Sequence, residues 1–246
     1  MTDGILLIDK PAHMTSFGVV ARVRRVLTEQ AQGKGAARAA DSLRARRDEG
    51  KPSVVPHKRQ RVKVGHTGTL DPFATGLMII VVGKECKNAG MYSKLDKVYE
   101  ATIQLGATST TGDPEGDIVP VANTVPTLDQ IQAALTAFTG EITQTPPIYS
   151  AIKIDGQRSY DLARAGKSVD MPQRRITVFS LELIDYAYPN VRIRTHVSSG
   201  TYIRTLAQDI GEHLGTGAYC TQLRRTKIAD WDIAAAQTLA EFGVND

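Results

Sequence analysis

The stretch G-H-T-G-T-L-D-P-F-A-T-G-L, residues 65–77, is the most informative part of the chain. It places one carboxylate, Asp71, in a loop of small residues directly before the apolar run Leu77–Val82. Its glycines let the backbone approach a ligand closely, and Pro72 restricts both its own φ and the conformation of Asp71. Asp-Pro alone would be ordinary turn material. The whole run instead predicts a rigidly held acid in an open loop at the edge of a sheet, where chemistry is commonly placed.

The composition fits a globular enzyme. The chain has 246 residues, of which 41% are hydrophobic and 23% charged, so it can bury a substantial core. Its longest apolar run is too short to span a bilayer, and no basic segment precedes Ile5–Ile8 as it would in a secretion signal. We therefore expect a cytoplasmic protein with no membrane partner. Cys86, Cys220 and the five histidines show no metal-ligand spacing, so we expect neither a metal site nor a cofactor.

The positive charge is concentrated in one segment. Residues 31–61 contain nine Lys or Arg and three acids, a net charge of +6, whereas the rest of the chain has 21 Lys or Arg and 23 acids. The segment has no aromatic residue and is rich in Ala and Gly, so it has little with which to build a core. We predict a single domain, residues 1–246, with a basic mobile insertion at about 31–61 that is attracted to polyanions. The alternative is a solvated linker.

Hydrophobic periodicity predicts a mixed α and β chain. Strands are expected at 4–9, 77–82, 97–105, 175–188, 191–197 and 218–228, and helices at 16–29, from 127 to Gly140, and at 201–214. Ser16 is a possible cap of the first helix, and Thr127 and Gln130 form a capping box for the second. Because strands and helices do not strictly alternate, the pattern favours an α+β fold over a doubly wound one. The strand 218–228 is expected to close the sheet.

Residues 65–77 resemble the catalytic motif of the TruB family of pseudouridine synthases at essentially every position. Four further segments match motifs of that family in its order: 4–11 with Thr15-Ser16, 97–100, 145–164 and 199–206. The resemblance covers most of residues 1–228. It implies the pseudouridine synthase fold, a large mixed and mostly antiparallel sheet flanked by helices.

The resemblance also implies an activity. The family isomerises a uridine in the T-loop of tRNA, at position 55, by flipping the base out, breaking its glycosidic bond and rejoining the sugar to C5. The implied partner is the tRNA T-arm stem-loop. We expect a monomer that needs no guide RNA and no cofactor.

The catalytic residues implied by the match are Asp71, Tyr99 and Arg204. A carboxylate next to the sugar and base suits Asp71 as nucleophile or base, and a nearby Arg204 would lower its pKa. Tyr99 and Tyr202 are expected to form aromatic walls, one stacking on the target base, a contact worth about 1–3 kcal/mol. On the residues alone, Tyr99 could equally be a core residue, and Arg204 a surface cation near a helix start.

Three further residues are implied to bind substrate. His66 matches the family histidine that fills the space left by the flipped base, which an imidazole can do by stacking and hydrogen bonding. Leu206 is expected to line the pocket. Lys10 offers a cation near a phosphate or near the active-site carboxylate; the alternative is an exposed lysine in a turn before Pro11.

The chain departs from the family pattern in two places. The basic segment 31–61 is longer than expected, and the chain stops at Asp246, which predicts that the C-terminal RNA-binding domain of the PUA type is missing. Two other functions are compatible with the same scaffold: a non-catalytic RNA-binding protein, and a hydrolase of N-glycosidic bonds. A hydrolase would need several acids near the loop, and the nearest, Asp113-Pro-Glu-Gly-Asp117, are expected to form a separate loop after the Tyr99 strand.

Overall fold

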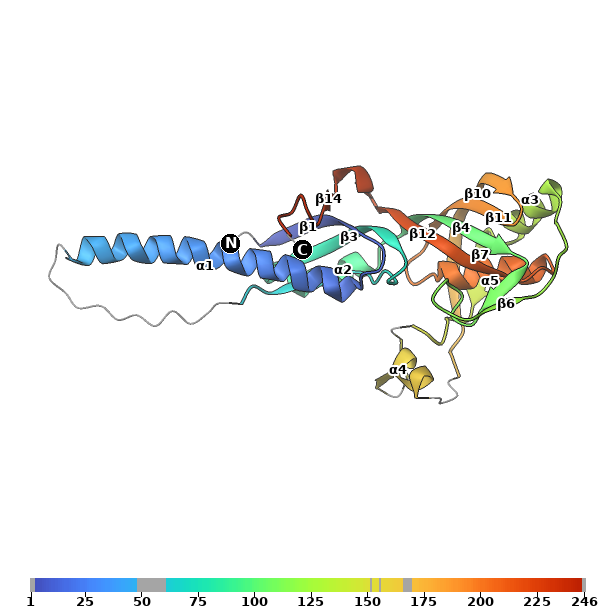
Figure 1. Ribbon diagram of the computed structural model, residues 1–246, viewed down its shortest axis with the longest axis horizontal. Coiled ribbons are helices and arrows are strands. Elements are labelled where there is room, and N and C mark those ends of the chain that lie inside the picture. The colour runs from blue at the N-terminus through green and yellow to red at the C-terminus, as the bar shows by residue number, and fades with distance from the viewer. Residues whose placement is uncertain (1–2, 48–60, 151, 155, 166–169, 245–246) are drawn as a thin grey trace.

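The computed structural model describes residues 3–47, 61–150, 152–154, 156–165 and 170–244 (Figure 1). Its helices are α1 (Ser16–Arg47), α2 (Ala89–Ser93), α3 (Leu128–Ala137), α4 (Ser159–Arg164) and α5 (Ile203–His213), with short 3-10 turns at Gly83–Asn88 and Ile233–Ala235. Its strands are β1 (Gly4–Lys10), β2 (Val64–His66), β3 (Thr75–Val82), β4 (Lys97–Leu105), β5 (Ala107–Ser109), β6 (Ile118–Pro120), β7 (Gly140–Gln144), β8 (Lys153–Ile154), β9 (Gln157–Arg158), β10 (Arg174–Ala187), β11 (Asn190–Val197), β12 (Ala218–Ile228), β13 (Trp231–Asp232) and β14 (Gln237–Thr238).

A ten-stranded sheet forms the body of the molecule. Its strand order is β14-β1-β3-β12-β4-β11-β10-β7, with β2 added to β3 and β13 to β12. All pairs in this sheet are antiparallel except β1 with β14 and β3 with β12. The predicted α+β fold, with a large mixed and mostly antiparallel sheet, is therefore confirmed.

The last long strand, β12, lies at the centre of the sheet. It pairs in parallel with β3, through Arg224 opposite Thr75 and Arg225 opposite Gly76, and antiparallel with β4 along most of its length. The expectation that residues 218–228 close the sheet is thus wrong. These pairings join segments far apart in the sequence, so local pattern does not reveal them. The loop between β2 and β3, which carries Asp71 and is called the catalytic loop after the motif that it resembles, enters the sheet at this junction.

Gly76 makes the junction between β3 and β12 possible. Its φ is +110°, which L side chains rarely adopt, and a Cβ there would lie 2.3 Å from the backbone oxygen of Arg225. The two backbones therefore approach as closely as they do only because residue 76 has no side chain.

Strand β3 is buried on both faces. Met78, Ile80 and Val82 belong to the main core, which α1, α3 and α5 cover, whereas Leu77, Ile79 and Val81 pack into a second apolar cluster on the other face. This double burial explains why residues 77–82 form an uninterrupted apolar run rather than an alternating one. Strand β4 shows the predicted alternation, with every second residue buried from Lys97 to Leu105.

The first helix differs from its predicted form. It continues to Arg47 instead of ending at 29, and its far end projects beyond the sheet (Figure 1). Residues 30–47 contain no proline and many Ala, Arg and Gln, which favour helix. Part of the predicted insertion is thus helical, and its residues 48–60 lie outside the described part of the chain.

The start of α1 is tied to the catalytic loop. Its cap is Thr15, whose Oγ1 accepts a hydrogen bond from the backbone N of Gly18 at 2.9 Å, rather than Ser16. The hydroxyl of Ser16 instead bonds both backbone groups of Leu70, at 2.8 and 2.9 Å. The capping box of α3 between Thr127 and Gln130 is present as predicted. No helix in the described residues is long and apolar enough to cross a membrane.

Candidate active site

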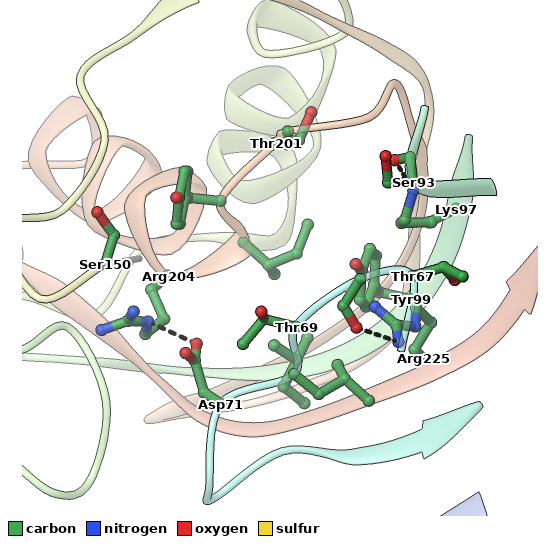
Figure 2. A pocket seen from close by; sticks show the side chains of 16 residues that line it. Thr67, Thr69, Asp71, Ser93, Lys97, Tyr99, Ser150, Thr201, Arg204 and Arg225 are labelled. Atoms are coloured by element: carbon green, nitrogen blue, oxygen red, sulfur yellow. Dashed lines mark hydrogen bonds and ion pairs between the residues drawn. The ribbon is translucent and has the colours of Figure 1, made fainter. Parts of the chain in front are cut away.

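A cavity of about 250 Å³ opens where the catalytic loop meets β4, β12 and the start of α5 (Figure 2). Its lining includes Thr67, Gly68, Thr69, Leu70, Asp71, Ser93, Lys97, Tyr99, Ser150, Gly200, Thr201, Tyr202, Ile203, Arg204, Leu223 and Arg225. The structure therefore brings Asp71, Tyr99, Tyr202 and Arg204 together, as the sequence predicted. Apolar walls and a few converging polar groups are typical of a ligand site.

Asp71 and Arg204 form an ion pair at one side of this cavity (Figure 2). Oδ2 of Asp71 lies 2.9 Å from Nε of Arg204, whose side chain is only 3% exposed, whereas that of Asp71 is 31% exposed. Among the described residues Nε has no partner other than this carboxylate, so the ion pair is what compensates it. The carboxylate is held near its counter-ion while one face stays open to the cavity.

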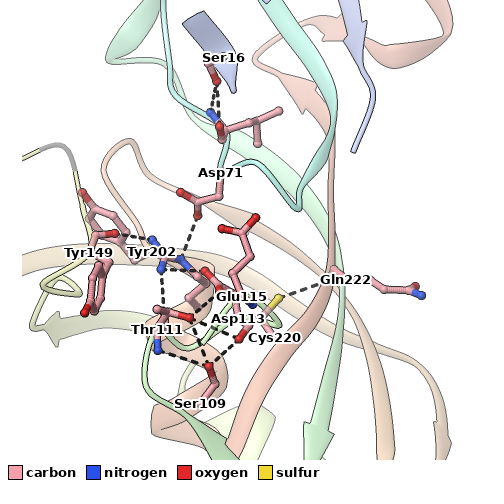
Figure 3. Close-up of polar contacts among 12 residues, drawn as sticks. Ser16, Asp71, Ser109, Thr111, Asp113, Glu115, Tyr149, Tyr202, Cys220 and Gln222 are labelled. Atoms are coloured by element: carbon pink, nitrogen blue, oxygen red, sulfur yellow. Dashed lines mark hydrogen bonds and ion pairs between the residues drawn. The ribbon is translucent and has the colours of Figure 1, made fainter. Parts of the chain in front are cut away.

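Arg204 is fixed from behind by groups of two other loops, whose residues Thr111, Asp113 and Tyr149 are labelled in Figure 3. Its Nη1 donates to the backbone oxygen of Thr111 at 2.7 Å and to Oδ2 of Asp113 at 3.0 Å, and its Nη2 donates to the backbone oxygen of Tyr149 at 2.9 Å. Asp113 is itself buried and accepts from the Thr111 hydroxyl and from the backbone N of Glu115. Arg204 thus lies between two carboxylates, and its orientation is set before any ligand binds.

The position of Asp113 corrects the sequence analysis. Residues 113–117 do form a loop, between β5 and β6, but the loop folds back so that Asp113 reaches Arg204. Strand β5 packs on β12, and the backbone N of Cys220 bonds the carbonyl of Gly112 at 3.0 Å, which brings the loop to the site. The signal in the sequence was an acid cluster in a protein expected to bind a polyanion; only the fold shows that one of its acids is paired.

The groups around Asp71 shift the pKa of its carboxyl in opposite directions. Burial raises the pKa of its carboxyl, Arg204 and Lys10 act to lower it, and the like charge of Asp113 raises it further. The net pKa is above the ordinary aspartate value. The prediction that Arg204 lowers this pKa describes one contribution correctly, but burial outweighs it.

The two tyrosines are placed by different elements. Tyr99 lies on the buried face of β4 and is 7% exposed, so it is both a core residue and part of the cavity wall. Tyr202 precedes α5, and the buried amide of Gln144 bonds both its backbone N, at 2.8 Å, and its backbone O, at 3.0 Å. The guanidinium of Arg174 lies 5.7 Å from the centre of the Tyr202 ring. Gln144 and Arg174 were not singled out from the sequence.

The other implied site residues lie around the cavity rather than in its wall. Leu206 is fully buried in the core, and Ile203 and Leu223 are among the apolar residues that line the cavity instead. His66 lies on β2; burial and Arg225 lower the pKa of its imidazole, and its buried Nδ1 has no hydrogen-bond partner among the described residues.

Lys10 is neither exposed nor directed to solvent. Its Nζ donates to the backbone oxygens of Pro11 at 2.8 Å, Met14 at 2.6 Å and Pro72 at 3.1 Å. Burial lowers the pKa of Lys10 to about 8, against the attraction of Asp71. The predicted cation near the active-site carboxylate is therefore present, beneath the loop that carries Asp71. In the described residues, no group of three or more His, Cys, Asp or Glu side chains could hold a metal ion.

Solved structures share this architecture. One is the "Crystal Structure of a Cbf5-Nop10-Gar1 Complex", with a TM-score of 0.65 and 27% identity over 96% of this chain and 52% of that chain. Another is the "Crystal structure of the archaeal box H/ACA sRNP Nop10-Cbf5 complex", with a TM-score of 0.62 and 25% identity over 97% of this chain. This chain spans about half the length of both matched chains. Fold and site together define the class of the pseudouridine synthases.

The chain belongs to the TruB family of pseudouridine synthases. The model "TruB family pseudouridylate synthase (N terminal domain)" matches residues 57–203, and "tRNA pseudouridylate synthase B C-terminal domain" matches residues 204–244. A protein of Azoarcus sp. (strain BH72) named "tRNA pseudouridine synthase B" is 41% identical over 97% of this chain and 69% of its own length. A namesake of Burkholderia mallei (strain NCTC 10247) is 40% identical over 96% of this chain and 68% of its own length. The predicted family and enzyme class are confirmed.

Proposed function

We propose that this enzyme converts the uridine at position 55, in the T-loop of tRNA, to pseudouridine, with Asp71 as the catalytic carboxylate. The observation that carries the proposal is the ion pair of Asp71 and Arg204 at the edge of a cavity walled by Tyr99 and Tyr202. The choice of T-loop and position follows from the match of residues 65–77 to the catalytic motif of the TruB family, whose relatives include the tRNA pseudouridine synthases B.

The reaction is an isomerisation that balances without a co-substrate. The bond from C1′ to N1 breaks and its electron pair stays on uracil. The base then turns, C5 bonds to C1′, the proton on C5 leaves and N1 gains a proton. No net oxidation or hydrolysis occurs, so the chemistry itself requires no redox carrier, nucleotide or water molecule.

The site suits this sequence of steps. A carboxylate beside the sugar can act as nucleophile or base while the glycosidic bond breaks, and it must be ionised to do so. Arg204 favours the ionised form, and the side chain of Asp71 stays 31% exposed, so the carboxylate can be reached from the cavity. Because C5 and C1′ are inaccessible in a stacked loop, the base must leave its stack and enter the cavity. Tyr99 and Tyr202 offer the aromatic faces that replace the lost stacking.

The proposed partner is the T-arm alone. The chain is 40–41% identical to proteins named tRNA pseudouridine synthase B. It is 25–27% identical to the matched chains of the Cbf5-Nop10-Gar1 and Nop10-Cbf5 complexes, which contain further components. On this basis we infer that the enzyme acts as a monomer, without a guide RNA. His66 is proposed to stack in the space that the flipped base leaves.

One experiment tests the proposal directly. The purified chain is incubated with an unmodified T-arm stem-loop transcript, and pseudouridine is mapped at single-nucleotide resolution. Modification of position 55 alone, without any added RNA, is expected. The matched control is the same stem-loop with cytidine at that position, which should bind and give no product. Modification only after a second RNA or protein is added would contradict the proposal.

The cofactor requirement is tested in the same assay. Prefolded stem-loop is used because magnesium ions also fold full-length tRNA. EDTA, and omission of nucleotides and redox carriers, should leave the rate unchanged.

A further inference from the structure

Arg225 is the largest fully buried side chain of the protein's described part, and the mechanism above does not use it. It lies on β12 and is 1% exposed. Among the described residues no carboxylate lies within ion-pairing distance of its guanidinium. A buried cation is costly unless its charge and its donors are compensated. The compensation must therefore come from other polar groups around it.

The compensating groups are backbone carbonyls on the two sides of the catalytic loop, one near its start and one in β3 directly after it. Nε of Arg225 donates to the backbone oxygen of Leu77 at 2.7 Å, and Nη2 donates to the backbone oxygen of Gly68 at 3.2 Å. These carbonyls stand on either side of Asp71 in the sequence. A single guanidinium, whose donors are fixed in one plane, thus bridges the two sides of the loop that carries Asp71.

The backbone of the same residue holds the loop from a third point. Arg225 is the partner of Gly76 in the parallel pairing of β12 with β3, at the close contact described above. At the other end of the loop, a Cβ on Gly68 would lie 3.6 Å from Nη1 of Arg225. Side chain and backbone of one residue therefore fix the loop in which Asp71 is carried.

The arrangement has an electrostatic cost. Arg225 contributes, after burial, to a lowered pKa of His66 and of Lys97, whose pKa is about 8. A neutral side chain at position 225 would remove this contribution to the lowered pKa of His66 and Lys97. A guanidinium retained at such a site is consistent with a geometric task that a neutral or single-donor side chain cannot perform.

We propose that Arg225 is a positioning residue, which holds the loop 67–77 so that Asp71 reaches the reacting nucleotide in the correct orientation. The expected effect of Arg225 on turnover rests on the proposed function. Its expected effect on the order of the loop does not. Arg225 acts through Gly68 and Leu77, and no hydrogen bond or ion pair among the described residues joins it to Asp71.

The test compares Arg225→Ala with Arg224→Ala. Arg224 is the preceding residue in β12 and is not part of the cavity wall. It pairs with Asp9 at 2.7 Å, and its side chain is 41% exposed. For Arg225→Ala, turnover at saturating RNA should fall by about 10²-fold, the loss expected when a reacting group is misplaced by roughly 1 Å. The dissociation constant for the stem-loop should change by no more than a few-fold, because Arg225 is only 1% exposed and its loss leaves the surface outside the cavity unchanged. Arg224→Ala should retain normal turnover.

Chemical rescue separates positioning from a general loss of structure. The deleted side chain lines the cavity, so added guanidinium at non-denaturing concentration can enter and should partly restore turnover of Arg225→Ala. It should not restore Asp71→Asn. Arg225→Lys keeps the charge but lacks the planar fork and should remain impaired. If Arg225→Ala does not fold, the turnover of folded Arg225→Lys is compared with that of Arg224→Ala instead, and it should be impaired.

A second measurement does not depend on activity. Backbone hydrogen exchange of residues 65–78, without RNA, should be faster in Arg225→Ala than in the wild type or Arg224→Ala, with exchange in β10 and β11 unchanged. If the wild type makes no pseudouridine, the proposed function fails and the exchange measurement still decides the role of Arg225. Unchanged loop exchange, or normal turnover by Arg225→Ala, would overturn the inference.

Discussion

Asp71 and Arg204 meet at 2.9 Å although they come from opposite halves of the sheet. Asp71 precedes β3, which pairs with β1, whereas Arg204 lies on α5, which follows the β10–β11 hairpin. In the sheet of the described residues, β12 alone joins the two halves. The ion pair of Asp71 and Arg204 therefore depends on this long-range pairing, which links folding of the sheet to assembly of the candidate site.

Replacing Asp71 with Asn should abolish isomerisation and leave RNA binding largely intact. The amide keeps the shape of the side chain and removes the charge that the reaction needs. Pseudouridine formation and the dissociation constant for the stem-loop are measured side by side. Near-normal turnover would show that another residue is the catalytic carboxylate.

Asp113→Asn should reduce turnover at saturating RNA by about 10²-fold, because Arg204 loses the anion that orients it, and small displacements at a reacting group are costly. Asp117→Asn is the matched control, since Asp117 lies in the same loop and is exposed. RNA affinity should be similar in both variants. Equal activity of the two variants would mean that Thr111 and Tyr149 suffice to hold Arg204.

The rate of the chemical step should fall as the pH is lowered through the pKa of Asp71. Because burial raises this pKa, the midpoint should lie above the ordinary aspartate value of about 3.9. The protonated carboxyl is the unreactive form, so activity is lost on the acid side. Single-turnover rates are measured over the range in which circular dichroism shows both protein and stem-loop to be folded. A midpoint at or below the ordinary value would contradict the assigned effect of burial.

Gly76→Ala should destabilise the protein severely, by more than about 3 kcal/mol, because the new Cβ would overlap the Arg225 backbone and φ is positive. Gly90→Ala is the control. Gly90 lies in α2 with nothing within 4 Å of the added Cβ, so that change should be neutral or mildly stabilising. Denaturant unfolding measures both. Equal stability of the two variants would show that β3 and β12 can separate at little cost.

The basic segment 31–61 should strengthen RNA binding without affecting the chemical step. Each contact with a phosphate steepens the dependence of log K on log salt by roughly 0.7–0.9. Replacing six Lys and Arg residues of the segment with Gln should flatten this slope and weaken RNA binding at low salt. The positions are Arg44, Arg46, Arg47, Lys58, Arg59 and Arg61.

The control for this segment replaces Lys84 and Arg175, whose side chains are 90% and 84% exposed on other surfaces. An unchanged slope in the six-residue variant would mean that the segment is a solvated linker. A collapse of the rate at saturating RNA would mean that it helps to build the site.

Much of this protein can be determined from the sequence alone, because its local signals are strong. The motif at 65–77 identifies the family and Asp71, and alternation along residues 97–105 gives β4 and the inward orientation of Tyr99. The capping box at Thr127 fixes the start of α3. Each of these depends on residues close together in the chain, whose spacing directly reflects backbone geometry.

Only the tertiary structure decided the rest, because it depends on contacts between distant segments. It placed β12 in the centre of the sheet, brought Asp113 to Arg204, buried Lys10 beneath the loop and moved Leu206 out of the cavity wall. It also set Arg225 across both ends of the catalytic loop. A residue whose partners lie tens of positions away gives no periodic or motif signal, so its task becomes visible only when the strands have paired.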